Sequence, residues 1–148
     1  MKNIFVFSVF LLSNYGYCQN KLSDLYLLYF ENTESQISQN KNLIMSRYSY
    51  AKDMPFSYVY ALNTMGGYIE LDTFTENYEG IKKFPTDTIT LDSLEMISLK
   101  DIRWLQQEYK KHIYMDLNEL YRNIYIIEID SIHKIAYRTK VVQVDRID

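Results

Sequence analysis

The sequence predicts an α+β fold, with an antiparallel sheet of about four to six strands and two helices packed on one face of that sheet. Three observations lead to this prediction. Residues 122–145 are rich in isoleucine, valine and tyrosine, and they indicate two strands joined by a short polar connection. Residues 56–62 alternate with a period of two and are followed by Gly66 and Gly67, a hairpin signal. Residues 98–113 carry apolar side chains at helical spacing.

The first 18 residues have the order of features expected of a secretory signal. Lys2 supplies a positive charge, and residues 4–12 are an apolar run interrupted by one serine. This run is too short to span a bilayer, which takes about 20 residues. Small residues at Gly16 and Cys18 then predict cleavage before Gln19. Residues 1–18 are therefore expected to be a signal peptide and residues 19–148 a single α+β domain, exported to the periplasm or secreted.

The N-terminus allows two other interpretations besides a cleaved signal. In a lipoprotein, Cys18 stays on the mature chain and carries the lipid. However, Tyr15 and Tyr17 stand where such signals normally have leucine and a small residue. In the second interpretation, residues 4–12 form a buried strand or helix. A basic start, an apolar run and a small-residue exit in this order favour the cleaved signal.

Charge and cysteine usage narrow the classes of function. The chain has 16 basic and 19 acidic residues, and removal of the signal leaves 15 bases and a net charge of −4. Nucleic acids and anionic membranes bind basic faces, so neither is an expected partner. Cys18 is the only cysteine, which excludes a disulfide framework and cysteine-based zinc or thiol chemistry after cleavage. No run in the mature chain is long and apolar enough for a transmembrane helix.

The first half of the mature chain is predicted to begin with a helix. The apolar residues of segment 22–39 fall in one stripe at about 100° per residue, although a strand over residues 25–30 is a competing interpretation. Strands and polar connections are expected to follow. The strands cover residues 43–50, 56–62, 68–75 and 88–92, and the connections include a turn at 52–55 and a loop at 76–85.

The second helix is expected to begin at Ser98, because residues 98–101 resemble a capping box with aspartate in place of glutamate. Its apolar stripe is about 120° wide. The stripe comprises Leu99, Ile102, Leu105, Tyr109 and Ile113. A short helix or turn over residues 116–122 then leads into the two predicted strands of residues 122–145, which together form the closing ribbon.

In the closing ribbon, neither strand alternates strictly between apolar and polar residues. Ile126 and Ile127 are adjacent and point to opposite faces, which indicates either cover on both sides or a bulge near Lys140. Acidic residues on the first strand face basic ones on the second in one possible register, which the sequence does not specify.

Trp104 is the residue that most suggests a partner site. On the helix it lies opposite the apolar stripe, beside Lys100, Glu108 and Lys111, and an exposed tryptophan among charges is typical of an anchor for a protein or a sugar. Trp104, Lys100 and Lys111 therefore form the candidate partner-binding set. The alternative, which the usual burial of tryptophan favours, is that another element covers this side of the helix.

Two carboxylate pairs, Glu70 with Asp72 and Glu128 with Asp130, invite a general acid–base interpretation, since residues two apart on a strand share a face. The favoured alternative is a solvated face of an acidic protein. The two histidines, His112 and His133, lack the sequence context of a nucleophile or a metal site. No catalytic, cofactor-binding or metal-binding residue is therefore predicted.

The aromatic run Phe56, Tyr58 and Tyr60 is suited to a platform for a glycan or a peptide, and equally to a sheet core, which is the favoured alternative. The sequence features are compatible with three hypotheses for the function. The first is a small exported domain that binds an unknown protein or glycan in the envelope or outside the cell. The second is an inhibitor or immunity-type protein acting on a secreted enzyme or toxin. The third is a hydrolase that uses a carboxylate pair. The lack of a catalytic constellation favours binding over enzymatic activity.

Overall fold

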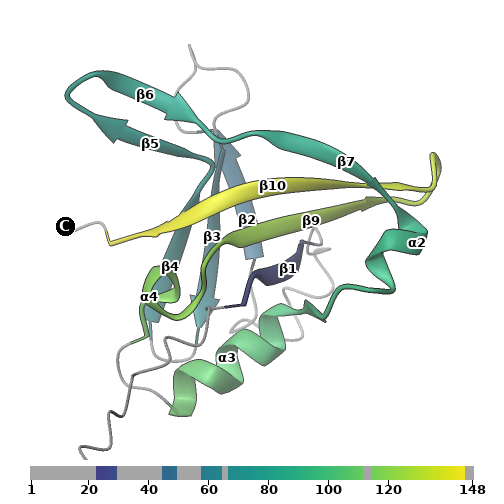
Figure 1. Ribbon diagram of the computed structural model, residues 1–148. Helices are drawn as coiled ribbons and strands as arrows, with labels where there is room; N and C mark the ends of the chain where they lie inside the picture. The colour runs from purple at the N-terminus through teal and green to yellow at the C-terminus, as the bar shows by residue number, and fades with distance from the viewer. Residues whose placement is uncertain (1–22, 30–44, 50–57, 65–66, 112–114, 146–148) are drawn as a thin grey trace, which may run out of the picture.

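The computed structural model describes residues 23–29, 45–49, 58–64, 67–111 and 115–145 (Figure 1). Over this part of the chain the fold is mostly β, with a mixed eight-stranded sheet, a separate two-stranded sheet and three short helices. Among these three helices, only α3 has seven residues or more. The prediction of an antiparallel sheet with two helices on one face therefore assigned too much helix. It also did not foresee the parallel pairing of β1 with β8 and β9. In chain order, the elements are β1 (Leu25–Tyr29), β2 (Met45–Ser49), β3 (Tyr58–Thr64), β4 (Gly67–Asp72), β5 (Phe74–Asn77), β6 (Gly80–Lys83), β7 (Thr86–Thr90), α2 (Leu91–Leu94), β8 (Leu99–Lys100), α3 (Ile102–Lys111), α4 (Leu117–Leu120), β9 (Ile124–Asp130) and β10 (Ile135–Val144).

The large sheet is organised around β10. Its strand order is β2-β3-β4-β10-β9-β1-β8, with β7 paired to β10 off this path. Strand β1 runs parallel to both β9 and β8, and the remaining pairs in this sheet are antiparallel. The half formed by β2, β3 and β4 crosses the half formed by β9, β10 and β7 at a steep angle (Figure 1).

Residues 25–29 form a strand, so the predicted helix over 22–39 is wrong there and the competing strand is correct. Leu25 and Leu27 are buried and alternate with half-buried neighbours. In register, Leu25 lies opposite Ile124 and Leu27 opposite Ile126. Pairing with β9 outweighs the helical stripe because burial between strands supplies more stabilisation than local helix propensity. The rest of the predicted helix lies outside the described residues.

Strands β3 and β4 confirm the predicted hairpin, with Thr64 paired to Gly67. Strand β2 lies within the predicted strand 43–50, whereas the turn at 52–55 lies outside the described residues. Glu70 and Asp72 on β4 are buried, which corrects the expectation that they lie on a solvated face.

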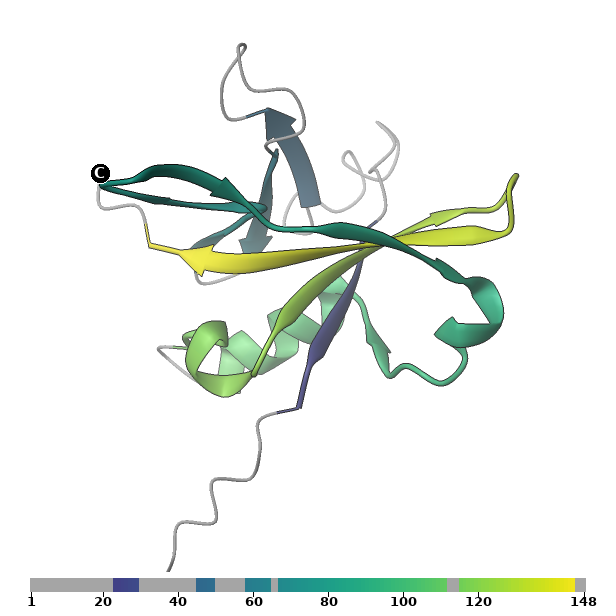
Figure 2. The same ribbon diagram turned by 45° about the horizontal axis from the view of Figure 1, so that its top comes forward.

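The predicted loop at 76–85 is instead largely the hairpin of β5 and β6, which projects from the body of the molecule (Figures 1 and 2). The Oδ1 atom of Asn77 accepts a hydrogen bond from the backbone N–H of Glu79 at 2.9 Å, and Gly80 has φ +115°. The asparagine side chain closes this turn, and glycine, which has no Cβ, adopts the positive φ. The polar composition of the segment concealed the strands.

The predicted strand at 88–92 corresponds to β7, which pairs with β10. Helix α2 begins at Leu91, and its N-cap Thr90 accepts a hydrogen bond from the backbone N–H of Ser93 at 3.4 Å. Strand β7 therefore ends two residues earlier than expected.

Helix α3 begins at Ile102 and not near Ser98, because Leu99 and Lys100 form β8 beside β1. The Oδ1 atom of Asp101 accepts a hydrogen bond from the backbone N–H of Trp104 at 2.9 Å and so takes the capping role expected of Ser98. Ile102 and Leu105 are buried, as the stripe predicted. The end of the stripe at Ile113 lies outside the described residues.

The closing ribbon is confirmed as the antiparallel pair β9 and β10, and α4 falls within the predicted short helix at 116–122. Ile126 and Ile127 are both 0 % exposed, so both faces of β9 are covered. The acid–base register does not form: Glu128 lies opposite Tyr137, and Arg138 pairs with Asp87 of β7.

The core lies between the two halves of the sheet and α3. It unites side chains from elements that are far apart in the sequence. Its buried members are Leu25, Leu27, Met45, Tyr60, Leu62, Ile69, Leu71, Ile102, Leu105, Met115, Leu117, Ile124, Ile126 and Val141.

Candidate functional site

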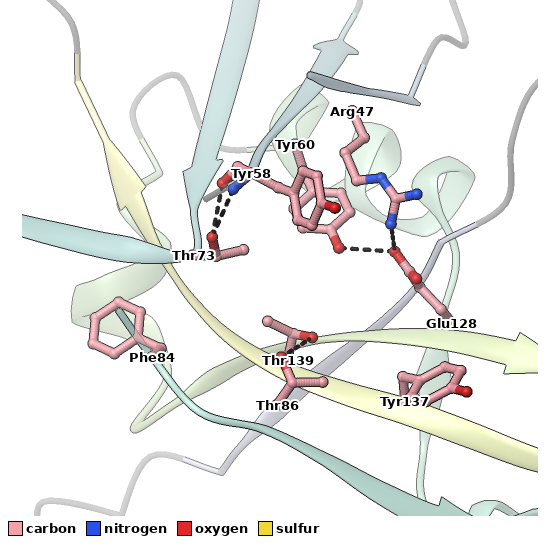
Figure 3. A pocket seen from close by; sticks show the side chains of 9 residues that line it. All are labelled: Arg47, Tyr58, Tyr60, Thr73, Phe84, Thr86, Glu128, Tyr137 and Thr139. Carbon is pink, nitrogen blue, oxygen red and sulfur yellow. Dashed lines mark hydrogen bonds and ion pairs between the residues drawn. The ribbon is translucent and has the colours of Figure 1, made fainter. Parts of the chain in front are cut away.

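A pocket of about 290 Å³ lies where the two halves of the large sheet separate (Figure 3). Side chains from β2, β3, β7, β9 and β10, and from the segments that flank the β5–β6 hairpin, form its walls. The lining residues are Arg47, Tyr58, Tyr60, Thr73, Phe84, Thr86, Glu128, Tyr137 and Thr139.

The pocket exists because β10 changes its partner along its length. Residues 135–139 of β10 pair with β7, and residues 142–144 pair with β4 on the same edge. The chain leaves β4, forms the β5–β6 hairpin and returns as β7, so the hairpin separates the two partners. At this point the backbone N–H of Phe84 donates to the carbonyl of Thr73 at 2.9 Å, and that of Lys140 donates to the carbonyl of Pro85 at 3.4 Å.

Glu128 organises one wall of the pocket. Its Oε1 atom lies 2.5 Å from Nη1 of Arg47 and accepts a hydrogen bond from the hydroxyl of Tyr60 at 2.8 Å (Figure 3). The guanidinium of Arg47 lies 4.8 Å from the ring centre of Tyr58 and 5.4 Å from that of Tyr29. This wall is therefore held by a charge-assisted hydrogen bond and two cation–π contacts.

The same surroundings keep Tyr60 protonated. Burial, followed by the charge of Glu128, raises the pKa of the Tyr60 phenol well above its ordinary value of 10.0. The hydroxyl consequently remains a hydrogen-bond donor at any physiological pH.

The facing wall is formed by hydroxyl groups between aromatic rings. The Oγ1 atoms of Thr86 and Thr139 lie 2.9 Å apart, and either one can be the donor. Phe84 and Tyr137 lie on either side of this threonine pair (Figure 3). Thr73 is engaged by the backbone of Tyr58, from whose N–H it accepts at 2.9 Å and to whose carbonyl it donates at 3.0 Å.

The pocket is electrically balanced and rich in aromatic rings. Arg47 and Glu128 are the only charged residues among its nine lining residues, and they pair with each other. Four of the other lining residues are aromatic and three are threonines. Such a surface offers apolar contact together with a few fixed polar groups, which is typical of small-ligand sites.

The predicted partner-binding set is only partly assembled. The Nζ atom of Lys100 lies 5.5 Å from the ring centre of Trp104, and Trp104 is half-buried and packs against the core. Lys111 instead pairs with Glu108, at 2.6 Å. None of these residues lines the pocket.

The carboxylate pairs are divided between different surroundings. Glu128 lines the pocket, whereas Asp130 holds the β9–β10 turn by accepting hydrogen bonds from the backbone N–H groups of Ile132 and His133 at 3.0 Å each. Nδ1 of His133 also lies 2.7 Å from Oδ2 of Asp130. Glu70 and Asp72 are not among the lining residues. His112 lies outside the described residues, and within the described part of the chain no three of the residues histidine, cysteine, aspartate and glutamate gather in a way that suits a metal ion.

Sequence reasoning identified part of the pocket. Tyr58 and Tyr60 belong to the aromatic run that suggested a platform, and Glu128 belongs to a carboxylate pair that invited an acid–base interpretation. Arg47, Phe84 and the threonines gave no local signal, because their significance arises only from the pairing of distant strands. The period-two pattern of residues 56–62 was the signal that pointed closest to the site.

None of the helices in the described ranges has the length and apolar character needed to cross a membrane. Comparison with protein-family models, with curated proteins and with solved structures finds no match to this chain.

Proposed function

We propose that this chain is a small exported binding domain that holds a ligand in the pocket between the two halves of its sheet. The observation that carries the proposal is the convergence of five strands on one pocket whose only two charges pair with each other. Export is the expectation that the N-terminal sequence pattern raises, and it suits a binding domain that acts in the envelope or outside the cell.

The pocket walls support binding because contacts within the protein hold several of their side chains in place. Glu128 is held by Arg47 and Tyr60, and Thr86 is held by Thr139. Side chains that are already ordered lose less conformational entropy when a ligand arrives, which improves affinity. The aromatic rings supply contact area at a low entropic cost.

A hydrolytic function is less well supported by this arrangement. Acid–base hydrolysis of a glycosidic bond normally takes two carboxylates on opposite sides of the bond, about 5 to 10 Å apart. Glu128 is the only carboxylate among the nine lining residues, and its Oε1 atom already accepts two hydrogen bonds. The carboxylate-pair hydrolase therefore ranks below binding.

The proposal is tested by NMR on protein with labelled threonine methyl groups, tyrosine rings and the single indole. A library of small compounds that covers cationic, anionic, neutral polar and apolar classes is titrated into the purified chain. We expect at least one class to shift the signals of Thr86, Thr139 and Tyr137 while the indole signal of Trp104 stays in place. Compounds that shift only Trp104 would move the binding site to α3 and contradict the proposal.

An inhibitor or immunity-type protein is the second candidate, and one observation favours it. Tyr78 lies in the turn between β5 and β6 and is 97 % exposed. This hairpin projects from the body of the molecule (Figure 2). An exposed aromatic side chain on a projecting element is suited to anchor a partner protein. Affinity capture from the native envelope with wild type, Tyr78→Ala and Trp104→Ala tests it. A partner lost only with Tyr78→Ala supports this function, and identical partners in all three samples contradict it.

A further inference from the structure

We propose that the ligand class of the pocket is a neutral saccharide residue, bound through one ring or one chain end. This inference rests on the proposed function, because it identifies the chemistry of the ligand that the same pocket would hold. Four properties of the pocket lead to it: charge balance, adaptable hydroxyl groups, aromatic faces and size.

The charge balance favours a neutral ligand. The Nη1 atom of Arg47 and the Oε1 atom of Glu128 are 2.5 Å apart, and their side chains are only about one-third and one-quarter exposed, at 32 % and 26 %. A charged ligand would compete for one member of this pair and leave the other without its counter-charge in a partly desolvated place. A neutral ligand leaves the ion pair intact.

The polar groups suit a ligand that carries several hydroxyls. A guanidinium has five N–H donors and a carboxylate accepts several hydrogen bonds, so the Arg47–Glu128 pair presents donors and acceptors side by side. Neighbouring hydroxyls on a sugar ring both donate and accept, and they match such a pair. One of Thr86 and Thr139 donates to the other, and the hydroxyl that accepts this hydrogen bond can still donate its own proton to a ligand.

The aromatic rings provide the apolar contact that one face of a sugar ring needs. Tyr58, Phe84 and Tyr137 line the pocket, and Tyr137 is 38 % exposed. The face of an aromatic ring carries negative partial charge, which attracts the weakly positive C–H groups of a sugar. A wholly apolar ligand would make the same contact with the rings. It would also remove the water that hydrogen-bonds to Glu128 and the threonine hydroxyls, and it has no polar group to replace those hydrogen bonds.

The volume sets an upper limit on the ligand. Pockets for small molecules usually measure about 300 to 1,000 Å³, and this pocket, at about 290 Å³, lies at the lower limit. One sugar ring or the end of a chain is therefore the expected occupant.

The test is a binding measurement on the purified full chain with four sets of probes. The neutral set contains glucose, galactose, mannose, N-acetylglucosamine and their common disaccharides. The other sets contain agmatine as a cation, acetate as an anion and cyclohexanol as a mainly apolar ring with a single hydroxyl group. Isothermal calorimetry and saturation-transfer NMR are expected to detect at least one neutral sugar with a Kd on the order of 1 mM, and weaker or no binding of the other probes.

Variants connect binding to the pocket. Tyr137→Ala and Thr86→Val are each expected to weaken sugar binding by about fivefold or more, while Tyr78→Ala, an equally simple change at an exposed tyrosine outside the pocket, leaves it unchanged. Circular dichroism confirms folding of each variant. If Tyr137→Ala fails to fold, Tyr137→Leu, which keeps apolar bulk but removes the aromatic face, takes its place in the comparison.

The remaining outcomes separate this inference from the proposed function. Binding of agmatine, acetate or cyclohexanol alone, with shifts at Thr86 and Tyr137, overturns the saccharide class and leaves the pocket as a ligand site. Sugar binding that survives both pocket variants overturns the saccharide inference for this pocket. No binding of any probe at about 50 mM, in a chain whose pocket signals also fail to respond to the wider library, overturns the inference and the proposed function together.

Discussion

Arg47 on β2 and Glu128 on β9 are 81 positions apart in the sequence, yet the Nη1 atom of the first lies 2.5 Å from the Oε1 atom of the second. This ion pair connects an edge strand of one half of the sheet with an internal strand of the other half, beside the pocket. The geometry of the pocket therefore depends on a long-range contact that forms only when both halves of the sheet are in place.

A double-mutant cycle with Arg47→Met and Glu128→Gln is expected to give a coupling energy of about 1 kcal/mol. The pair is partly shielded from water, so its coupling should exceed that of the Glu108–Lys111 pair, whose lysine is well exposed. Urea unfolding near pH 7 measures both cycles. Equal coupling in the two cycles would show that partial burial does not strengthen the Arg47–Glu128 pair.

The ion pair of Asp24 and Arg122 is expected to make stability depend on acid pH. Arg122 donates from Nε to Oδ1 at 3.0 Å and from Nη2 to Oδ2 at 3.1 Å, and Asn123 donates to Oδ1 at 3.0 Å. The hydrogen bond from Arg122 is the main cause that lowers the pKa of Asp24 below its ordinary value of 3.8, against the opposing effect of burial. Because the folded-state pKa is depressed, the stabilisation is present above the unfolded-state pKa and is lost as the pH falls through the folded-state pKa.

The corresponding measurement compares wild type with Asp24→Asn. The urea midpoint of wild type should exceed that of the variant near pH 7, and the difference should shrink as the pH falls below the ordinary aspartate pKa of 3.8. Asp92→Asn, a change at an exposed carboxylate on α2, serves as the matched control. A difference between wild type and Asp24→Asn that stays constant with pH would contradict the proposed role of the Asp24 charge.

Leu105 is expected to be a major contributor to the packing of α3 on the sheet. It is 0 % exposed and belongs to the core, whereas Leu120 on α4 is 44 % exposed. Leu105→Ala should lower the free energy of unfolding by about 2 to 5 kcal/mol, since the change leaves a cavity. Leu120→Ala should lower it by less than about 1 kcal/mol. Urea unfolding of the two variants decides the point, and similar losses would show that α3 does not cover the core as described.

Gln143 is expected to hold α4 against β10. Its Oε1 atom accepts a hydrogen bond from the backbone N–H of Leu117 at 2.9 Å, and its backbone groups exchange two hydrogen bonds with the side chain of Asn118. Gln143→Leu keeps the backbone contacts and removes the acceptor, so it should cost about 1 to 3 kcal/mol. It should also accelerate amide exchange at Leu117. Gln107→Leu, at an exposed position of α3, is the control and should leave that amide protected.

Local patterns in the sequence were sufficient for two hairpins, β3–β4 and β9–β10, but not for β5–β6, which was predicted as a loop. The glycines after residue 64 and the β-branched runs of 124–144 predicted two antiparallel pairs that the structure contains. The stripe of Ile102 and Leu105 predicted a helix whose buried face is correct, although it begins later than expected because β8 takes residues 99–100. In each case the neighbours in sequence are also the neighbours in space, so local composition carries the information.

The sequence alone determined the closing ribbon, the β3–β4 hairpin and the buried face of α3, and it raised the expectation of export. Only the tertiary structure decided that residues 25–29 form a parallel strand, that Glu70 and Asp72 are buried, and that Arg47, Glu128 and the threonine pair surround one pocket. The physical reason is that a strand has no partner within its own segment. Its pairing and the side chains it brings together depend on contacts between distant parts of the chain, which no local pattern specifies.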